Sequence, residues 1–425
     1  MTNKNNGTVD EVFLEPLRRA IDEAGTRSCR EYADADHVVA GVLRILEKID
    51  SGREWAQVAP EGFGISGLTL SRYFGAVNSA RRLALVERVA EAVASEADRG
   101  CPAGEDPLAG HEELRRFEAY ATDGHSVAAS SHEPETLGKV RAPSHIYSLD
   151  LRKRSLRHLA LCQPQEGKKK EHEMATLKRI DSAALRMGAP KGTKVIHAYD
   201  PAIYDFAQWE RWKRAKGVYI ITVEKANSAL YARESREWDR HDPRNNGVED
   251  DQTVGSNGGQ VMRRVTYRDP VTLKAYRFLT TEFTLPPGLI AFIYKLRWDI
   301  EKAYDHTKND LGEGKAWSKS ESGKVQQSKF ITIAYNLCVI FERLLKSDEG
   351  IVDEKSLRKA RERLAEQMAK AKQNGAAFNS LVSSCVRVTK RSLQFLRWLR
   401  HCLRAKRSWS EAIAALRPLM LKYIT

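Results

Sequence analysis

Four residues able to bind phosphate or a metal ion recur at helical spacing in one segment of the chain. They are Tyr294, Arg297, Glu301 and Lys308. The sequence predicts that their helix begins near Pro287, and at about 100° per residue the four side chains fall within roughly 60° of one another. The guanidinium and the ammonium suit phosphate, and the carboxylate suits a hard cation. The alternative is an amphipathic helix whose solvated face carries an ordinary Arg297–Glu301 ion pair.

The spacing Tyr-x2-Arg-x3-Glu-x6-Lys resembles the signature of a family of bacterial insertion-sequence transposases, which have a YREK motif and a DDE catalytic triad. The resemblance implies a ribonuclease H-like core. In that core one Asp lies on the first strand, a second lies near the end of the fourth, and the Glu follows on a helix beyond a β-rich insertion. It implies that Asp123, Asp200 and Glu301 are the catalytic carboxylates.

The two upstream aspartates are assigned from their local sequence. Asp123 ends a strand-like run and precedes glycine, and Asp200 follows an apolar run and precedes Tyr-Asp-Phe. Taken singly, each has the sequence of a turn or helix-cap residue. Asp150 competes with Asp123 because it also ends a strand-like run, but Asp123 leaves room for a hairpin and a helix before Asp200. Two departures from the family pattern, His125 for Thr and Val223 for Arg, leave the carboxylates intact.

The resemblance also implies the cofactor and the reaction. Asp123, Asp200 and Glu301 would hold two Mg²⁺ or Mn²⁺ ions about 4 Å apart. The two ions would stabilise the entering and the leaving oxygen of the phosphodiester. Water would release a 3′-hydroxyl at a transposon end, and that hydroxyl would attack target DNA. Tyr294 and Lys308, with the forked guanidinium of Arg297, would contact the neighbouring phosphates.

Two tryptophans are candidates for DNA contact. Some members of the family hold a flipped base on an aromatic residue of the insertion, and Trp238 has that place here. The alternative for Trp238 is ordinary packing. Trp298 lies beside the motif residues, where it would support their helix from its flank and border the DNA.

Composition agrees with a DNA-binding enzyme. The 425 residues allow two or three domains, and a net charge of +14 favours a polyanionic partner. The six cysteines are far apart and show no zinc-ligand spacing, and no apolar stretch is long enough to span a bilayer. We therefore expect no membrane, a cytoplasmic protein associated with the bacterial nucleoid, and double-stranded DNA as the partner.

Hydrophobic periodicity divides the chain into regions. Residues 1–99 have helical spacing, residues 100–112 form a Gly/Pro-rich linker, and residues 113–346 alternate strands and helices as an α/β catalytic domain does. A polar, β-rich insertion is predicted at about 227–283, and residues 347–425 form a basic helical region. Strand-like runs occur at 117–122, 145–150, 156–162, 194–199 and 218–223.

Three functions fit these patterns. The leading one is DNA transposition by a homo-oligomer, a dimer when two transposon ends are paired. The second is a catalytically weak or domesticated relative that binds DNA as a regulator. The third is a helix-turn-helix protein, because the run at 65–74 has Gly and Ser/Thr caps with Arg72, Arg81 and Arg82 nearby. Basic segments at 152–157, 168–170 and 390–407 are further candidates for DNA contact, or else solvated faces and a partner interface.

Overall fold

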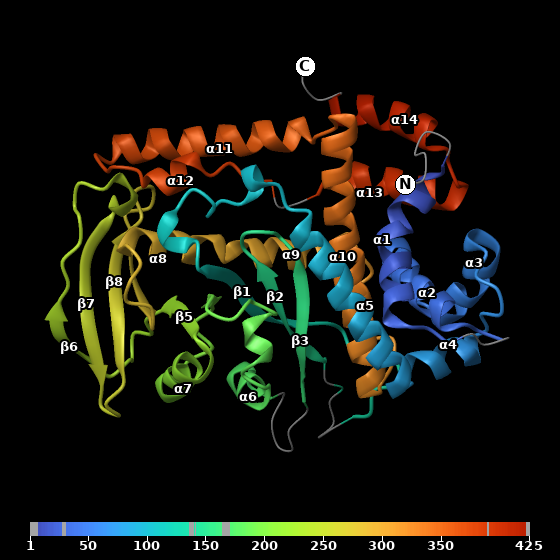
Figure 1. Ribbon diagram of the computed structural model, residues 1–425, viewed down its shortest axis with the longest axis horizontal. Helices are drawn as coiled ribbons and strands as arrows, with labels where there is room; N and C mark the ends of the chain where they lie inside the picture. Colours follow the sequence, from blue (N-terminus) through green and yellow to red (C-terminus); the bar gives the residue numbers. More distant parts are fainter. Residues whose placement is uncertain are drawn as a thin grey trace.

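The computed structural model describes residues 7–27, 31–135, 140, 142–163, 171–388 and 391–421. Its strands within these ranges form one nine-stranded sheet of order β3-β2-β1-β4-β5-β9-β8-β7-β6 (Figure 1). The strands are β1 (Phe117–Ser126), β2 (Ser144–Asp150), β3 (Leu156–Cys162), β4 (Lys194–Tyr199), β5 (Val218–Val223), β6 (Leu230–Ser235), β7 (Val248–Ser256), β8 (Val261–Arg268) and β9 (Ala275–Thr280). The runs predicted as β1 to β5 are all strands.

The first five strands have the topology that positions the site. β1, β2 and β3 pair antiparallel, while β4 lies parallel to β1 and β5 lies parallel to β4. Two parallel neighbours place the carboxyl ends of β1 and β4 at the same edge of the sheet. The prediction of a ribonuclease H-like mixed sheet with flanking helices is confirmed.

The β-rich insertion extends this sheet and does not form a second one. β9 pairs antiparallel with β5, and β8, β7 and β6 follow outward in antiparallel order. β6 is the last strand and is almost wholly exposed. The insertion therefore continues the catalytic sheet on the side of β5.

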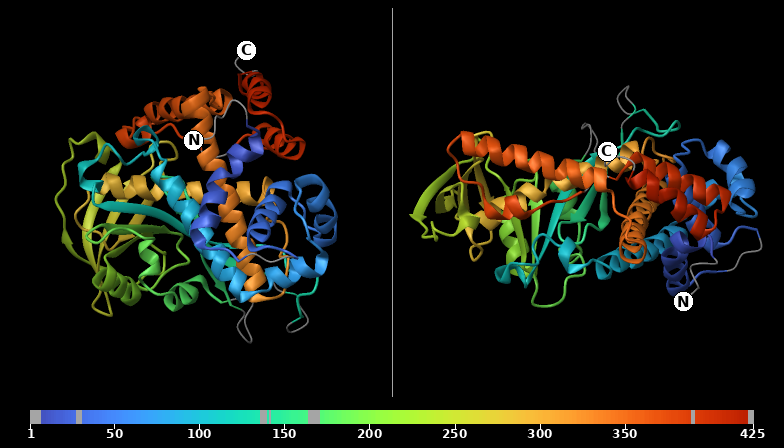
Figure 2. Two further views of the ribbon diagram at one scale, coloured as in Figure 1. Left: turned by 45° about the vertical axis from the view of Figure 1, so that its right-hand side comes forward. Right: turned by 90° about the horizontal axis from the view of Figure 1, so that it is seen from above.

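Helices cover both faces of the sheet (Figures 1 and 2). α6 (Glu173–Arg179) and α7 (Phe206–Lys216) bury Leu177, Trp209 and Trp212 in one cluster with residues of β4 and β5. On the other face, α8 (Pro287–Leu296) and α10 (Glu321–Glu349) belong to a larger cluster. α10 crosses the predicted boundary at residue 346 without a break.

The amino-terminal helices pack on α10 and share its core. They are α1 (Val9–Ala24), α2 (Asp34–Glu47), α3 (Gly52–Phe63), α4 (Leu70–Val77) and α5 (Ala80–Arg99). α5 begins after Ser79, whose hydroxyl accepts a hydrogen bond from the Arg82 backbone amide, and it lies along α10. The side chain of Arg72 pairs with Glu31, and those of Arg81 and Arg82 pair with Asp34. These arginines of the predicted helix-turn-helix segment thus have partners within the protein.

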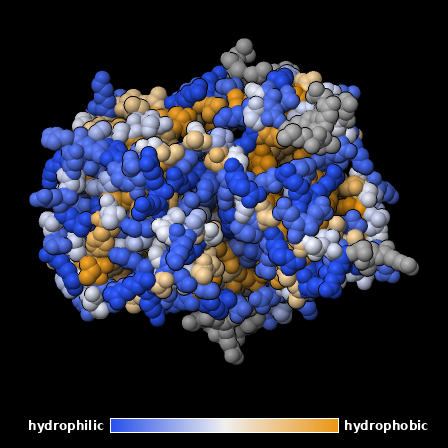
Figure 3. Space-filling view, viewed as in Figure 1, coloured by the Kyte–Doolittle hydropathy of each residue, from blue (hydrophilic) through white to orange (hydrophobic). Residues whose placement is uncertain are grey.

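The carboxy-terminal helices run across the top of the molecule in Figure 1 and end beside the amino-terminal helices. α11 (Glu354–Gln373) crosses the molecule above α12 (Ser380–Ser384) and α8, and α13 (Leu393–Ala405) and α14 (Trp409–Leu421) pack together (Figure 1). The face in Figure 3 is mostly hydrophilic, with apolar side chains in scattered small areas. Within the described ranges, none of the helices combines the length and apolar character needed to cross a membrane.

Candidate active site

The two candidate aspartates lie side by side at the carboxyl ends of two parallel strands. Thr122 of β1 is in register with Tyr199 of β4, the last residue of that strand. Asp123 and Asp200 are the next residue on each chain segment. The sheet therefore brings together two carboxylates that the sequence separates widely.

The motif segment is broken at Arg297. The expected single helix is two helices, α8 and α9 (Trp298–Asn309), and Arg297 ends one and starts the other. The Arg297 amide donates to the carbonyl of Tyr294, and the Ile300 amide donates to the carbonyl of Arg297, each at 3.1 Å. These hydrogen bonds three residues apart tighten the turn, as a 3₁₀ segment does, so the expectation of one continuous helix is wrong.

Arg297 connects two of the three candidate carboxylates. Its guanidinium lies 3.0 Å from an oxygen of Glu301 and 3.8 Å from an oxygen of Asp123. The Arg297 side chain is 7% exposed, while that of Glu301 is 40% exposed. The guanidinium also lies over the rings of Tyr294, at 5.5 Å, and Trp298, at 5.2 Å. The break at Arg297 thus aims a buried cation at Asp123 and leaves Glu301 open to solvent.

Negative charge gathers around Asp123. Burial raises the pKa of its carboxyl to about 7, and the negative charges of Glu173 and Asp200 add to that rise. The Gly124 amide and the Arg297 guanidinium oppose it. Burial likewise raises the pKa of Tyr294, with smaller contributions from Asp200 and Asp123. Asp200, Asp123 and Tyr294 are therefore close enough to act on one another.

A second contact fastens α9 to β1. The Tyr304 hydroxyl donates a hydrogen bond of 2.7 Å to the backbone carbonyl of Asp123, and the His125 ring stacks on the Tyr304 ring at 4.5 Å. Nε2 of His125 lies 3.5 Å from Glu313, a buried carboxylate that accepts a hydrogen bond from the Tyr147 hydroxyl. His125, noted as a departure from the family pattern, therefore supports the wall of the site.

Sequence reasoning missed Glu173, the first residue of α6. A Cβ placed on Gly124 would lie 2.2 Å from the Oε1 atom of Glu173, so the Glu173 carboxylate rests directly on the Gly124 backbone. Gly124 lies within β1 and needs no turn geometry, and a Cβ at this position would have to displace the end of the Glu173 side chain. An acidic residue opening the helix after the third strand was the available signal.

Asp150 has a structural role. It is paired with Tyr120 in the antiparallel β1–β2 ladder, several residues from the Asp123 end. One of its carboxylate oxygens accepts hydrogen bonds from the backbone amides of Arg152 and Lys153, both at 2.8 Å. Asp150 therefore fixes the β2–β3 turn.

The remaining candidates predicted from the sequence, Lys308, Trp298 and Trp238, differ in their surroundings. Lys308 lies in the last turn of α9, is exposed and has its charge near His125, whose pKa burial and Lys308 lower to about 4. Trp298 is 55% exposed at the start of α9. Trp238 lies in the insertion after β6, with the Arg240 guanidinium 4.5 Å from the centre of its ring.

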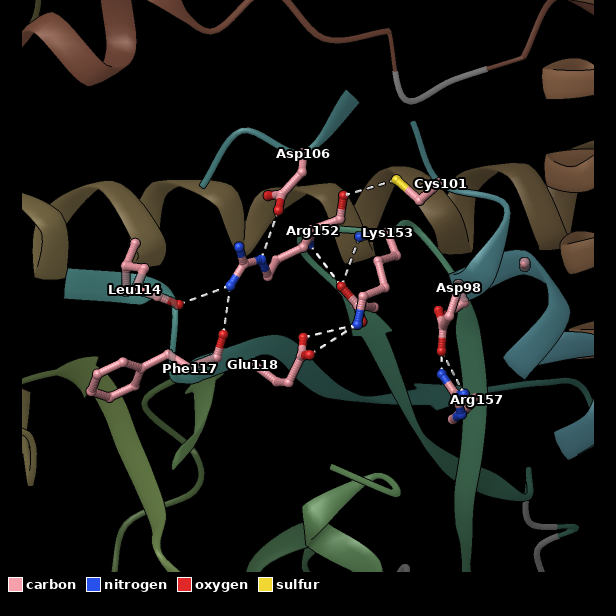
Figure 4. Close-up of polar contacts among 12 residues, drawn as sticks. Asp98, Cys101, Asp106, Leu114, Phe117, Glu118, Arg152, Lys153 and Arg157 are labelled. Atoms are coloured by element: carbon pink, nitrogen blue, oxygen red, sulfur yellow. Dashed lines mark hydrogen bonds and ion pairs between the residues drawn. The ribbon is translucent and has the colours of Figure 1, made fainter. Parts of the chain in front are cut away.

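The basic segments predicted as DNA tracks are largely paired within the protein. Figure 4 shows Arg152 bound to Asp106 and to two backbone carbonyls, Lys153 to Glu118, and Arg157 to Asp98. In the carboxy-terminal segment, Arg391 and Arg404 pair with Glu342 and Glu47, and Arg400 donates to the backbone carbonyls of Leu46 and Asp310. Residues 168–170 and Lys390 lie outside the described residues.

The carboxylates agree in type with a divalent cation site. Asp123, Asp200, Glu301 and Glu173 offer hard oxygen donors; burial raises the pKa of Asp123, and the smaller contribution from the charges of Glu173 and Asp200 is of the kind that a cation offsets. Across the described ranges, no group of three or more His, Cys, Asp and Glu side chains is placed to hold a metal ion. Arg297 is the positive partner shared by Asp123 and Glu301.

Comparison with known families adds one match. Residues 168–337 match the model of the transposase DDE domain. The match supports a DDE transposase. It includes Glu173, Asp200 and Glu301 and begins after Asp123. Such transposases act on DNA, and their DDE domains generally use divalent metals. A comparison with curated protein sequences gave no match.

Proposed function

We propose that this protein is a DNA transposase of the YREK-signature family, working in the bacterial nucleoid. It cleaves the ends of a transposon in a Mg²⁺-dependent reaction and transfers the freed strand into target DNA. The observation that carries the proposal is the placement of Asp123, Asp200 and the Arg297–Glu301 pair around one end of β1. The DDE-domain match supports it independently.

Asp123, Asp200 and Glu301 are the proposed ligands of two Mg²⁺ or Mn²⁺ ions. When bound, such ions activate the attacking oxygen and stabilise the leaving one. The Asp123 side chain is 18% exposed and is acted on by the charges of both Arg297 and Asp200, which would suit a position shared by the two ions. The Glu301 side chain is 40% exposed and is open to an incoming strand.

Arg297, Tyr294 and Lys308 would position the DNA. The fork of Arg297 already faces two carboxylates, and it can hold a phosphate oxygen while its flat side remains packed between two aromatic rings. Lys308 offers an exposed ammonium at the end of α9. These groups orient the strand and offset charge, and no covalent protein intermediate is required.

Trp298 and Trp238 would contact bases. Trp298 is a large aromatic side chain that is 55% exposed next to the carboxylates. Stacking of a base on an exposed aromatic face stabilises a complex by roughly 1–3 kcal/mol. Trp238 is the counterpart on the insertion. Pairing of two ends would require two copies of the chain.

Cleavage of the gene's own flanking DNA tests the proposal. Purified full-length protein is incubated with Mg²⁺ and duplexes from both flanks, and wild type is compared with Glu301→Gln. Glu112→Gln, on the exposed η3 (Glu112–Leu114), is the matched control because it removes the same charge away from the site. We expect specific end cleavage by wild type and by E112Q and none by E301Q. Specific binding without cleavage by any of them would favour the regulator.

A further inference from the structure

We propose that Arg387, in the carboxy-terminal region, is a positioning residue for the candidate active site. It holds the first turn of α9 through Asp299, and that turn carries Glu301 and follows Arg297. The inference rests on the proposed function, in which Glu301 is a metal ligand. It gives a role in that site to a residue outside the segment that matches the DDE domain.

An ion pair joins Arg387 to Asp299 across a long stretch of sequence. Nη1 of Arg387 lies 3.1 Å from Oδ2 of Asp299, and the two side chains are 11% and 7% exposed. Asp299 also pairs with Lys302 at 3.0 Å, but Lys302 lies on the same helix and its side chain is half exposed. Of these two cations, Arg387 is the one that ties Asp299 to another part of the fold.

Apolar packing alone does not fix the direction of this turn. In the described structure Arg297, the N-cap residue of α9, makes no side-chain capping hydrogen bond, and Trp298 is exposed. Ile300 is buried in the larger apolar cluster, but the burial of apolar surface is non-directional. The Arg387–Asp299 pair is a contact between two specific atoms, so it sets which way the turn faces.

The segment that carries Arg387 is itself anchored on both sides. Before it, Asn379 caps α12 and donates a hydrogen bond to the backbone carbonyl of Arg244, and α12 packs on α8. After it, Nε of Arg391 lies 2.8 Å from the carboxylate of Glu342 on α10. Arg387 therefore extends from a segment with fixed ends, as a residue that positions a helix must.

Loss of the Arg387 charge leaves a buried carboxylate at Asp299 less well compensated. Breaking a buried ion pair by removing one partner is strongly destabilising, and the remaining acid is expected to move towards water. Because the residues of one helical turn move together, Arg297 and Glu301 would be displaced with it. The 3.8 Å approach of Arg297 to Asp123 would change as well.

The contact depends on charge more than on the shape of the guanidinium. In the described structure neither Nη1 of Arg387 nor Oδ2 of Asp299 has a hydrogen-bond partner, so their contact is an ion pair without hydrogen-bond geometry. A lysine at position 387 would supply the same charge without the planar fork. Arg387→Lys is therefore the conservative variant, and Arg387→Gln removes the charge.

Hydrogen–deuterium exchange of the full-length protein tests the inference without activity. Peptides covering 300–304 are followed, because these amides donate to carbonyls at the start of α9. We expect R387Q to speed their exchange about tenfold or more, since an interaction with a charged group is lost, and R387K to stay close to wild type. Asp299→Asn should act as R387Q does, and the double variant should be no faster than either single variant. Exchange in R387Q equal to that of wild type would overturn the inference.

The second measurement is the Mg²⁺ concentration that gives half-maximal cleavage of flank DNA, at a temperature where every variant is folded. R387Q should need about tenfold more Mg²⁺, because lost support for a metal ligand weakens metal binding, and R387K should need as much as wild type. An unchanged requirement in R387Q would overturn the positioning role.

Arg343→Gln is the matched control for both measurements. The Arg343 side chain is 8% exposed and also pairs at 3.1 Å, with Glu105 of the linker. R343Q should lose stability but keep the wild-type exchange at 300–304 and the wild-type Mg²⁺ requirement. If wild type does not cleave flank DNA, the proposed function fails, and the exchange at 300–304 still decides whether Arg387 holds α9.

Discussion

The hydroxyl of Tyr304 donates a 2.7 Å hydrogen bond to the backbone carbonyl of Asp123. Through this contact the helix that carries Glu301 is held against the strand that carries Asp123. Tyr304 is about one turn from Glu301 on α9, so the hydrogen bond fixes where the Glu301 carboxylate lies relative to β1. A backbone acceptor serves this purpose well, because it keeps its place whatever the Asp123 side chain binds.

Tyr304→Phe should therefore make the position of Glu301 less well fixed while all three candidate carboxylates stay in place. Removing the hydroxyl takes away one part-buried hydrogen bond, which costs about 0.5–1.5 kcal/mol of unfolding free energy. Chemical denaturation measures that loss, and cleavage of flank DNA at a fixed Mg²⁺ concentration measures the effect on rate. We expect a lower cleavage rate in protein that is still folded. Wild-type cleavage by Y304F would show that the contact does not position Glu301.

Trp298→Ala should weaken DNA binding with little effect on stability. The side chain is 55% exposed, so its truncation should change the unfolding free energy by less than about 0.5 kcal/mol. Loss of one stacked base should weaken binding by roughly 1–3 kcal/mol, which is about fivefold to a hundredfold. Fluorescence anisotropy with flank DNA measures it. Tyr231→Ala, on the exposed edge strand β6, is the matched control at 47% exposure and should bind as wild type does.

Arg157→Gln should lower the stability of the fold without changing the salt dependence of DNA binding. Arg157 is buried and binds Glu91, which is 58% exposed, and Asp98, which is 19% exposed, so its removal should cost about 1–3 kcal/mol, mainly through lost hydrogen bonds and packing. Its guanidinium does not face solvent, so the salt dependence of DNA binding should not change. Urea unfolding and salt titrations of binding measure the two quantities. Arg115→Gln, in an exposed pair with Glu112, is the stability control and should cost less than about 1 kcal/mol. A shallower salt dependence of DNA binding in R157Q would instead show that this basic segment contacts DNA.

Stability should fall on acidification partly through His37. This residue of α2 is buried, its Nε2 lies 2.8 Å from Oε1 of Gln326, and burial lowers its pKa from 6.5 to about 4. Because the folded pKa is below the unfolded one, the stabilisation is fully present above pH 6.5. It is lost between pH 6.5 and about 4, and that loss amounts to roughly 3 kcal/mol.

Urea unfolding at several pH values measures this slope, and His37→Asn removes the titrating group. The variant should be less stable than wild type at pH 7 because it loses packing, but its free energy of unfolding should fall less between pH 6.5 and 4. An equal slope in both proteins would mean that other groups account for the acid sensitivity.

The sequence by itself determined the strands and the motif residues. The runs at 156–162, 194–199 and 218–223 are strands with those same bounds, because apolar β-rich runs between polar breaks are a local signal. The order Asp123, Asp200, insertion, Glu301 is also a property of the chain. Together with the resemblance carried by the spacing of Tyr294, Arg297, Glu301 and Lys308, it predicted the fold class and a DDE transposase, and the DDE-domain match supports the latter.

Only the tertiary structure decided how these groups meet. The break at Arg297 lies where α8, which packs on β5, β7, β8 and β9, gives way to α9, which packs on β1 and β2, and helical periodicity carries no sign of it. The internal pairing of Arg157 depends on α5, which is remote in sequence. Glu173 reaches Gly124 because α6 packs beneath the sheet. Spacing along a chain reports neighbours within one element, whereas charge pairs and close approaches between elements depend on how those elements pack.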